Sequence, residues 1–249
     1  MELIYKTEIP VTTALCDCFG RLKPSALLAL MQEAAGAHCT SLQAGWDQLR
    51  TRGLFWAVAR QSVELQRLPH IGERLYLETW PGEATRAAYP RFYQGSTVQG
   101  EPLFRAAALW LLMDLESRVM VVPGSSGVQV PGLLRGGELA LPVGLAPAIH
   151  NQSERRTVRF SEQDCNGHMS NTRYLDWMTD LLPGEFHRTH GLSYFRISYL
   201  SEAREGEQVD LSWDLDPTGG LLLEGRRPGA GSPDRVFALQ ARFDLRQIL

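Results

Sequence analysis

The chain has 249 residues, of which 44% are hydrophobic and 21% charged, and its 28 acidic and 25 basic residues give a net charge of −3. This composition is typical of a globular protein with one large or two small domains, and it gives no bulk electrostatic reason to expect nucleic-acid binding. The N-terminal residues lack an apolar run long enough for a signal peptide, and no window of about 18 apolar residues predicts a membrane span. We therefore expect a cytoplasmic protein.

The first half of the sequence predicts one helix followed by a series of strands. A strand is expected within residues 3–15, and a helix follows in which Leu27, Met31 and Ala34 recur at the spacing of one buried face. Pro24 lies near the start of this helix. The strands expected after it are residues 54–68, 73–80, 87–98 and 102–113.

The second half repeats this order after a stretch rich in glycine and proline. Residues 155–160 are expected to form a strand, and Tyr174, Trp177 and Met178 share the buried face of a helix that Pro183 and Gly184 end. The following expected strands are residues 192–202, 207–215, 219–226 and 234–246. Turn signals such as "VQGEP" and "DPTGG" between neighbouring strands favour antiparallel hairpins.

Four sequence blocks occur twice in the same order. "DCFGRL" at 17–22 returns as "DCNGHM" at 164–169, and "GLFWAVARQSVE" from Gly53 returns as "GLSYFRISYLSE" from Gly191. "GERLYL" and "ALWLLMDL" are then matched by "GEQVDL" and "ALQARFDL". This order indicates a duplicated unit of roughly 110 residues, in which one helix is covered by an antiparallel sheet. The predicted fold class is therefore α+β.

The four cysteines, at positions 16, 18, 39 and 165, include no Cys-x-x-Cys pair and no matching histidine spacing. A zinc site or a disulfide framework is therefore not expected, and we interpret the cysteines as reduced, mostly buried thiols. No metal or other cofactor is predicted.

The segment "DCNGHMSNTRYLDW" at 164–177 resembles the N-x-H-x-x-N-x-x-Y-x-x-W motif of the acyl-acyl carrier protein thioesterases of plants and bacteria. In the first half, "GLFWAVARQSVELQRLPHIGERLYLETWP" is similar to the W-x-x-x-R segment and following strand of that family. "GEPLFRAAALWLLMDLESRVMVVP" is similar to the family's S-x-W-x-x-M-D hairpin. The resemblance covers nearly the whole chain.

The resemblance implies a tandem (double) hotdog fold, in which each unit is an antiparallel sheet wrapped around a central helix. We expect an N-terminal unit at 1–122, a linker at 123–152 and a catalytic C-terminal unit at 153–249. The implied activity is hydrolysis of fatty acyl-acyl carrier protein to free fatty acid and holo-acyl carrier protein in fatty acid biosynthesis. The implied partner is the acylated carrier protein, and the chain is expected to be a monomer or a homodimer.

The functional residues that the family implies are Asp164, Asn166, His168 and Glu202. Many plant members have a cysteine after the glutamate, but this chain has Ala203, so a cysteine nucleophile at that position is ruled out. Thioester hydrolysis needs an activated water and stabilisation of an oxyanion. A helix starting near residues 168–170 would offer free backbone N–H groups, while either carboxylate could be the base.

Each of these residues also has a purely structural interpretation. Asp164 could form a turn and helix cap, His168 could be a surface or capping residue, and Glu202 could be an ordinary solvated carboxylate. Ser170 and Asn171 are interpreted as residues that cap the helix. His38, on the buried stripe of the first helix, is interpreted as structural or as lining a tunnel for the acyl chain.

The two copies differ where the chemistry is expected. Phe19 and Arg21 take the places of Asn166 and His168, so the first copy is predicted to shape the acyl-chain cavity rather than to catalyse. Acyl-coenzyme A hydrolysis, a non-hydrolytic acyl-binding role and a dehydratase activity are the alternatives. A basic group near the second motif could dock the acidic carrier protein or could simply be exposed to solvent; it comprises Arg155, Arg156, Arg159 and Arg173.

Overall fold

The computed structural model describes residues 2–229 and 234–246, and it divides into two compact units, Met1–Pro142 and Val143–Leu249. The expected linker is divided between them: residues 123–142 belong to the first unit, and 143–151 open the second without helix or strand. No helix in the described part of the chain combines the length and apolarity needed to cross a membrane.

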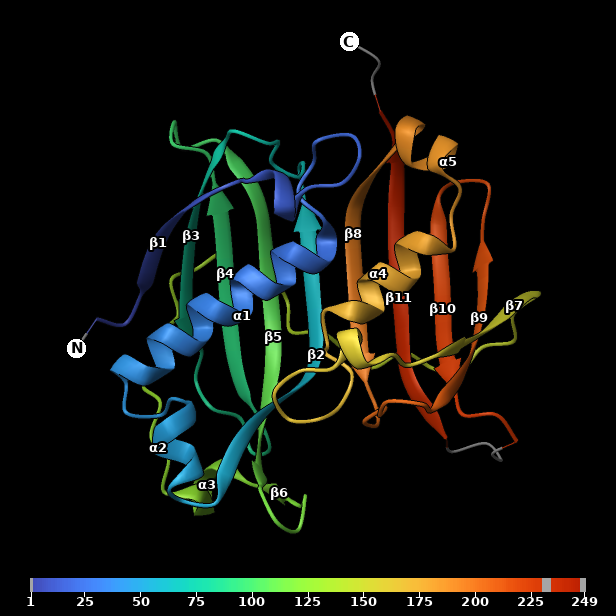
Figure 1. Cartoon of the computed structure of the whole chain (residues 1–249). Helices are drawn as coiled ribbons and strands as arrows, with labels where there is room; N and C mark the ends of the chain where they lie inside the picture. Colours follow the sequence, from blue (N-terminus) through green and yellow to red (C-terminus); the bar gives the residue numbers. More distant parts are fainter. Residues whose placement is uncertain (1, 230–233, 247–249) are drawn as a thin grey trace. The chain divides into compact units, whose positions relative to one another are not determined.

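The first unit is an antiparallel sheet with the strand order β1-β3-β4-β5-β2, and a short strand β6 pairs with β5. Helix α1 lies along one face of this sheet, and α2 follows it (Figure 1). The bounds of these elements are β1 Tyr5–Pro10, α1 Pro24–Ser41, α2 Trp46–Arg50, β2 Leu54–Leu65, β3 Arg74–Pro81, β4 Tyr89–Ser96, β5 Pro102–Asp114, β6 Met120–Val121 and α3 Pro123–Ser126.

The second unit has the equivalent strand order, β7-β9-β10-β11-β8, and is antiparallel throughout. Its central helix α4 is shorter than α1 (Figure 1). The bounds are β7 Gln152–Thr157, α4 Arg173–Asp180, α5 Gly184–Thr189, β8 His190–Tyr199, β9 Gln208–Leu215, β10 Gly220–Arg226 and β11 Arg235–Leu245. The duplication and the predicted α+β double hotdog fold are therefore confirmed.

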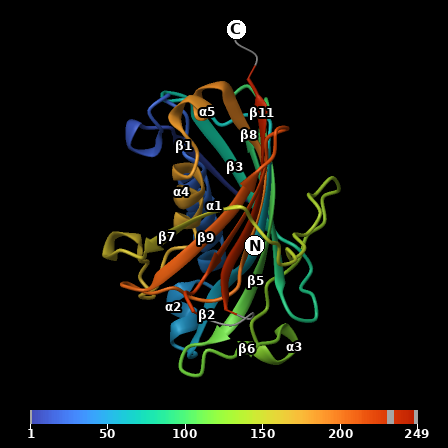
Figure 2. The ribbon, with the colours of Figure 1, turned by 90° about the vertical axis from the view of Figure 1, so that its right-hand side faces the viewer.

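Alternating burial explains how each sheet covers its helix. In β3, Leu75 and Leu77 are fully buried while their neighbours along the strand are more exposed, which is the period of a strand with one covered face. In α1, Leu27 and Met31 are fully buried, as the helical spacing predicted. On the sheet face opposite α1, the segment after α3 packs against β3 and β4 through Leu133 and Leu139 (Figure 2).

A close backbone approach occurs at the same place in both sheets. Gly95 in β4 pairs with Phe104, and Gly225 in β10 pairs with Phe237, and in each pair the aromatic ring fills the space of a Cβ. Because both pairs lie on equivalent strands, they show which positions of the two sheets correspond. All four cysteines are free, as expected, but Cys18 and Cys165 are exposed rather than buried.

Candidate active site

The candidate site is built on a tight loop at residues 163–169, which enters the segment before α4. Gln163 and Met169 form an isolated antiparallel bridge, and the Asp164 N–H donates to the His168 carbonyl over 2.9 Å. Gly167, with φ of +78°, occupies the left-handed region that glycine adopts without steric cost. The loop therefore has one closed geometry that presents its polar side chains together.

Asp164 and Asn166 interact directly within this loop. The Asp164 Oδ1 atom accepts a 2.8 Å hydrogen bond from the Asn166 backbone N–H, and Oδ2 lies 3.4 Å from Asn166 Nδ2, which donates to it. These contacts fix the orientation of the carboxylate. Asn166 is thus placed to orient Asp164.

Glu202 is held beside the loop by a backbone hydrogen bond of the next residue, Ala203. The Met169 N–H donates to the Ala203 carbonyl over 2.7 Å, so the turn after β8 is held against the loop. This places Glu202 beside the motif although the two are far apart in sequence. The Glu202 side chain is 36% exposed and also lies 3.8 Å from Arg204 Nη2.

His168 lies between the two carboxylates. Its Nδ1 atom is 3.8 Å from Asp164 Oδ1, and its Nε2 atom is 3.5 Å from Glu202 Oε1, without the alignment of a hydrogen bond. The imidazole is 18% exposed, so it is more shielded from water than Glu202. The structure therefore brings together the four residues for which the sequence predicts a catalytic function, and their roles are taken up below as a proposal.

The expected start of the helix at 168–170 is wrong. Helix α4 begins at Arg173, with Thr172 as its N-cap residue and no side-chain capping hydrogen bond. The backbone N–H groups of Met169 and Ser170 donate instead to the carbonyls of Ala203 and Glu162, over 2.7 and 2.8 Å. These N–H groups are therefore not free to stabilise an oxyanion, and Ser170 and Asn171 do not cap the helix with their side chains.

The same loop in the first copy holds an ion pair. Asp17 Oδ1 accepts from the backbone N–H groups of Phe19 and Arg21, and Arg21 Nη2 lies 2.8 Å from Asp17 Oδ2. The Leu22 N–H donates to the Pro69 carbonyl as the Met169 N–H does to that of Ala203, so Leu68, and not Glu64 as the repeated sequence blocks align it, corresponds to Glu202. The first copy therefore lacks the amide, the imidazole and the second carboxylate.

The basic residues near the second motif are mostly ion-paired. Arg155 binds Asp210, Arg156 binds both Glu154 and Asp180, and Arg173 binds Asp176. Arg159 is exposed, and within residues 2–229 and 234–246 no ion pair of its guanidinium occurs. The positive charge available to a partner at this surface is therefore smaller than the sequence indicated.

His38 and Arg91 form a buried polar pair in the first unit, of which the sequence analysis identified only His38. His38 is 1% exposed; its Nε2 lies 3.0 Å from the Glu2 carbonyl, and its Nδ1 lies 3.3 Å from Arg91 Nη1. Burial lowers the pKa of His38, and the Arg91 charge lowers it further. Arg91 also donates to Thr79 Oγ1 over 3.2 Å. No motif marks Arg91, because an arginine on a strand is ordinarily exposed.

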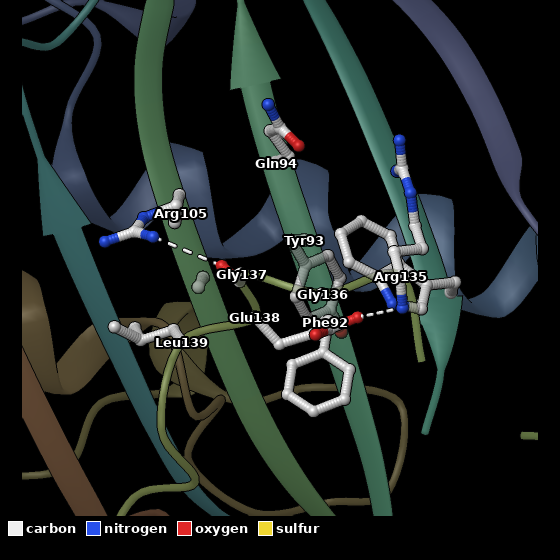
Figure 3. A pocket seen from close by; sticks show the side chains of 11 residues that line it. Phe92, Tyr93, Gln94, Arg105, Arg135, Gly136, Gly137, Glu138 and Leu139 are labelled. Atoms are coloured by element: carbon white, nitrogen blue, oxygen red, sulfur yellow. Dashed lines mark hydrogen bonds between the residues drawn. The ribbon is translucent and has the colours of Figure 1, made fainter. Parts of the chain in front are cut away.

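Figure 3 shows a hollow on the first sheet, between β3, β4, β5 and residues 135–139. Both arginines that line it contact other residues of the chain. Arg105 donates to the Gly137 carbonyl, while Arg135 forms an ion pair with Glu78 and lies over the Trp80 ring. These contacts attach the segment after α3 to the sheet. None of the residues lining the hollow belongs to the candidate site.

Two units of this topology define a tandem hotdog protein, and a histidine between two carboxylates is suited to acid–base chemistry. The chain belongs to the acyl-ACP thioesterase family. The N-terminal domain of that family matches residues 2–123, and its C-terminal domain matches residues 147–221.

Individual relatives agree with this assignment. An acyl-[acyl-carrier-protein] hydrolase of Cuphea viscosissima is 24% identical over 213 residues, which cover 77% of this chain and 50% of that protein. Oleoyl-acyl carrier protein thioesterase 1 of Arabidopsis thaliana is 25% identical over 229 residues, covering 84% of this chain and 63% of that protein. The chain spans about half the length of the curated relatives it matches.

Solved structures share the fold over nearly the whole chain. An acyl-ACP thioesterase from Bacteroides thetaiotaomicron has a TM-score of 0.82 at 22% identity, covering 97% of this chain and 98% of that chain. The 12:0-ACP thioesterase from Umbellularia californica has a TM-score of 0.82 at 19% identity, covering 99% of each chain. At these identities the likeness shows the fold.

Proposed function

We propose that this chain hydrolyses fatty acyl-acyl carrier protein to free fatty acid and holo-acyl carrier protein, with Asp164, Asn166, His168 and Glu202 as its functional residues. The observation that carries the proposal is the position of His168 within 4 Å of both carboxylates. The first copy offers a matched comparison, because the same loop there holds an arginine in place of the histidine.

The contacts suggest a division of roles between the carboxylates. Asp164 is held by hydrogen bonds from Asn166, so it orients the imidazole rather than moving protons itself. Glu202 is the more exposed carboxylate and faces Nε2, so it is the base that takes a proton from the attacking water. His168 relays that proton to the departing thiolate, and no covalent intermediate is required.

The acyl tail is assigned to the first unit. Its helix α1 has 18 residues, compared with 8 in α4, and buries an apolar face formed by residues such as Leu27 and Met31. A long apolar helix face under a sheet supplies the surface that a fatty acyl chain needs. The units would thus divide the task, with the tail held in the first and the thioester cleaved in the second.

Release of free thiol from a panel of substrates tests this proposal. The panel pairs acyl chains of several lengths with acyl carrier protein, coenzyme A and N-acetylcysteamine. The proposal expects turnover to be fastest with the carrier protein. Faster turnover of coenzyme A thioesters would make the chain an acyl-coenzyme A thioesterase, and binding without thiol release would make it a non-hydrolytic acyl-binding protein.

A further inference from the structure

Asn171 carries a buried hydrogen-bond donor that nothing in the described part of the chain accepts. Its Nδ2 atom is inaccessible to water and has no hydrogen-bond partner among residues 2–229 and 234–246. The residue itself is firmly placed, because its carbonyl accepts a 3.0 Å hydrogen bond from the Tyr199 hydroxyl. Tyr199 lies in β8 and its ring packs against Tyr174 of α4.

An unsatisfied buried donor is costly. Most buried polar groups have a partner, and leaving one without costs about 1–3 kcal/mol. Helix capping does not account for Asn171, because Thr172 is the N-cap residue and makes no side-chain capping bond. The amide is therefore available to an acceptor from outside the chain.

The first copy has no such donor. The Lys23 N–H donates to the Leu15 carbonyl as the Ser170 N–H does to that of Glu162, so the residues that follow, Pro24 and Asn171, correspond. Pro24 is the first residue of α1 and has no side-chain amide, whereas Asn171 precedes α4, which begins at Arg173. Asn171 is thus a further polar residue that occurs only in the copy with the candidate site.

The candidate site also needs a hydrogen-bond donor for the reacting oxygen. Attack of water on a thioester carbonyl moves the carbonyl electron pair onto oxygen, and that oxyanion needs a hydrogen-bond donor. The N–H groups of Met169 and Ser170, between His168 and Asn171, are already bonded to the Ala203 and Glu162 carbonyls. In the described part of the chain, the side chain of Asn171, three residues after His168, carries a buried donor without a partner; His168 Nε2 is the other buried side-chain nitrogen of this segment without one.

We infer that the Asn171 side-chain amide donates a hydrogen bond to the carbonyl oxygen of the bound thioester and stabilises the oxyanion formed on it. This role rests on the proposed thioester hydrolysis. The amide transfers no proton. Water oxygen bonds to the carbonyl carbon, its proton passes to the Glu202 carboxylate, and the carbon–sulfur bond breaks as the oxyanion returns its electron pair. The thiolate then takes up the proton.

Two non-hydrolysable pantetheine analogues of one acyl length isolate this contact. One is a ketone, in which a methylene replaces sulfur and the carbonyl is kept; the other is a thioether, in which a methylene replaces the carbonyl. Wild type should bind the ketone about tenfold more tightly than the thioether, a contribution typical of one good hydrogen bond. In Asn171→Ala this preference should shrink to within about twofold, and kcat should fall on the order of 100-fold.

Asn171→Asp, which is nearly isosteric but has no amide donor, should repeat the Asn171→Ala result and guards against a variant that fails to fold. Ser170→Ala is the matched control and should keep the ketone preference, because the Ser170 hydroxyl contacts Thr172. If wild type hydrolyses thioesters and prefers the ketone, but both Asn171 variants keep that preference, the role of Asn171 is overturned and the proposed hydrolysis is not. If wild type releases no thiol from any substrate, the proposed function itself fails.

Discussion

Asp17 and Arg21 form an ion pair in the first unit, with Arg21 Nη2 2.8 Å from Asp17 Oδ2. These two residues occupy the positions equivalent to Asp164 and His168 in the second unit. The Arg21 side chain is 6% exposed and that of Asp17 is 30% exposed, so the arginine is the more shielded partner of the pair. Both loops keep the same backbone hydrogen bonds. The aspartate of the duplicated loop therefore has a different partner in each copy. It forms an ion pair with an arginine in the first copy and faces a histidine in the second.

This ion pair should support stability and not turnover. Arg21→Ala leaves Asp17 without its buried partner, so we expect the free energy of unfolding to fall by about 2 kcal/mol. Urea unfolding measures the change, and kcat of the folded protein should stay within about twofold of wild type. The matched control is Arg155→Ala, which removes an exposed ion pair with Asp210 and should cost less than about 1 kcal/mol. A large loss of turnover in folded Arg21→Ala would contradict this assignment.

Acyl-chain preference should respond to the central helix of the first unit. Met31→Ala removes a fully buried side chain from α1, and the space left can accommodate more of an acyl tail. Because each methylene buried is worth about 0.8 kcal/mol, we expect relative turnover to shift toward longer chains by about fourfold per added methylene. Met178→Ala in α4 is an equally buried control. A shift in the control, but not in Met31→Ala, would place the tail elsewhere.

Carrier-protein recognition should depend on the arginine that is not already ion-paired. Arg159→Gln should raise KM for acyl-acyl carrier protein several-fold, while Arg155→Gln should have a smaller effect because Asp210 already offsets its charge. Added salt should weaken wild type more than Arg159→Gln. An N-acetylcysteamine thioester, which has no carrier, should be hydrolysed equally by all three proteins. Equal losses on both substrates would mean that Arg159 supports the fold or the site.

The buried His38 should make the first unit sensitive to acid. Burial lowers its pKa in the folded protein, so below the ordinary value of about 6.5 the unfolded chain binds the proton more readily. The contribution of neutral His38 to the free energy of unfolding should therefore be complete above pH 6.5 and should decrease as the pH falls below it. Urea unfolding at pH 7.5 and 5.5 measures this slope, which should be smaller in His38→Gln. An unchanged slope in the variant would assign the effect to other groups.

The order of helices and strands could be predicted from sequence because each element had its own periodic signal. Leu75 and Leu77 alternate with exposed residues, and Leu27 and Met31 recur at helical spacing, so the covered faces were evident. The short helix α5 was missed because Pro183 and Gly184 are typical of a helix end, and here they also begin the next helix.

The start of α4 could not be predicted because tertiary contacts decide it. Ser170, Asn171 and Thr172 are all residues that favour a helix N-terminus, so the sequence alone does not choose among them. The carbonyls of Ala203 and Glu162 bind the N–H groups of Met169 and Ser170 and hold this segment outside the helix. By contrast, the correspondence of Leu68 with Glu202 could have been found from the repeated "GERLYL" and "GEQVDL" blocks, which have the same offset.

The most direct test of the account compares one substitution at the two equivalent loops. Asp164→Asn and Asp17→Asn each replace the first aspartate of the motif by its amide, and the thiol released from acyl-acyl carrier protein is measured for both folded variants. We expect Asp164→Asn to lower kcat on the order of 100-fold or more, and Asp17→Asn to remain within about twofold of wild type. Near-normal turnover in Asp164→Asn, or an equal loss in both variants, would contradict a single catalytic site in the second unit.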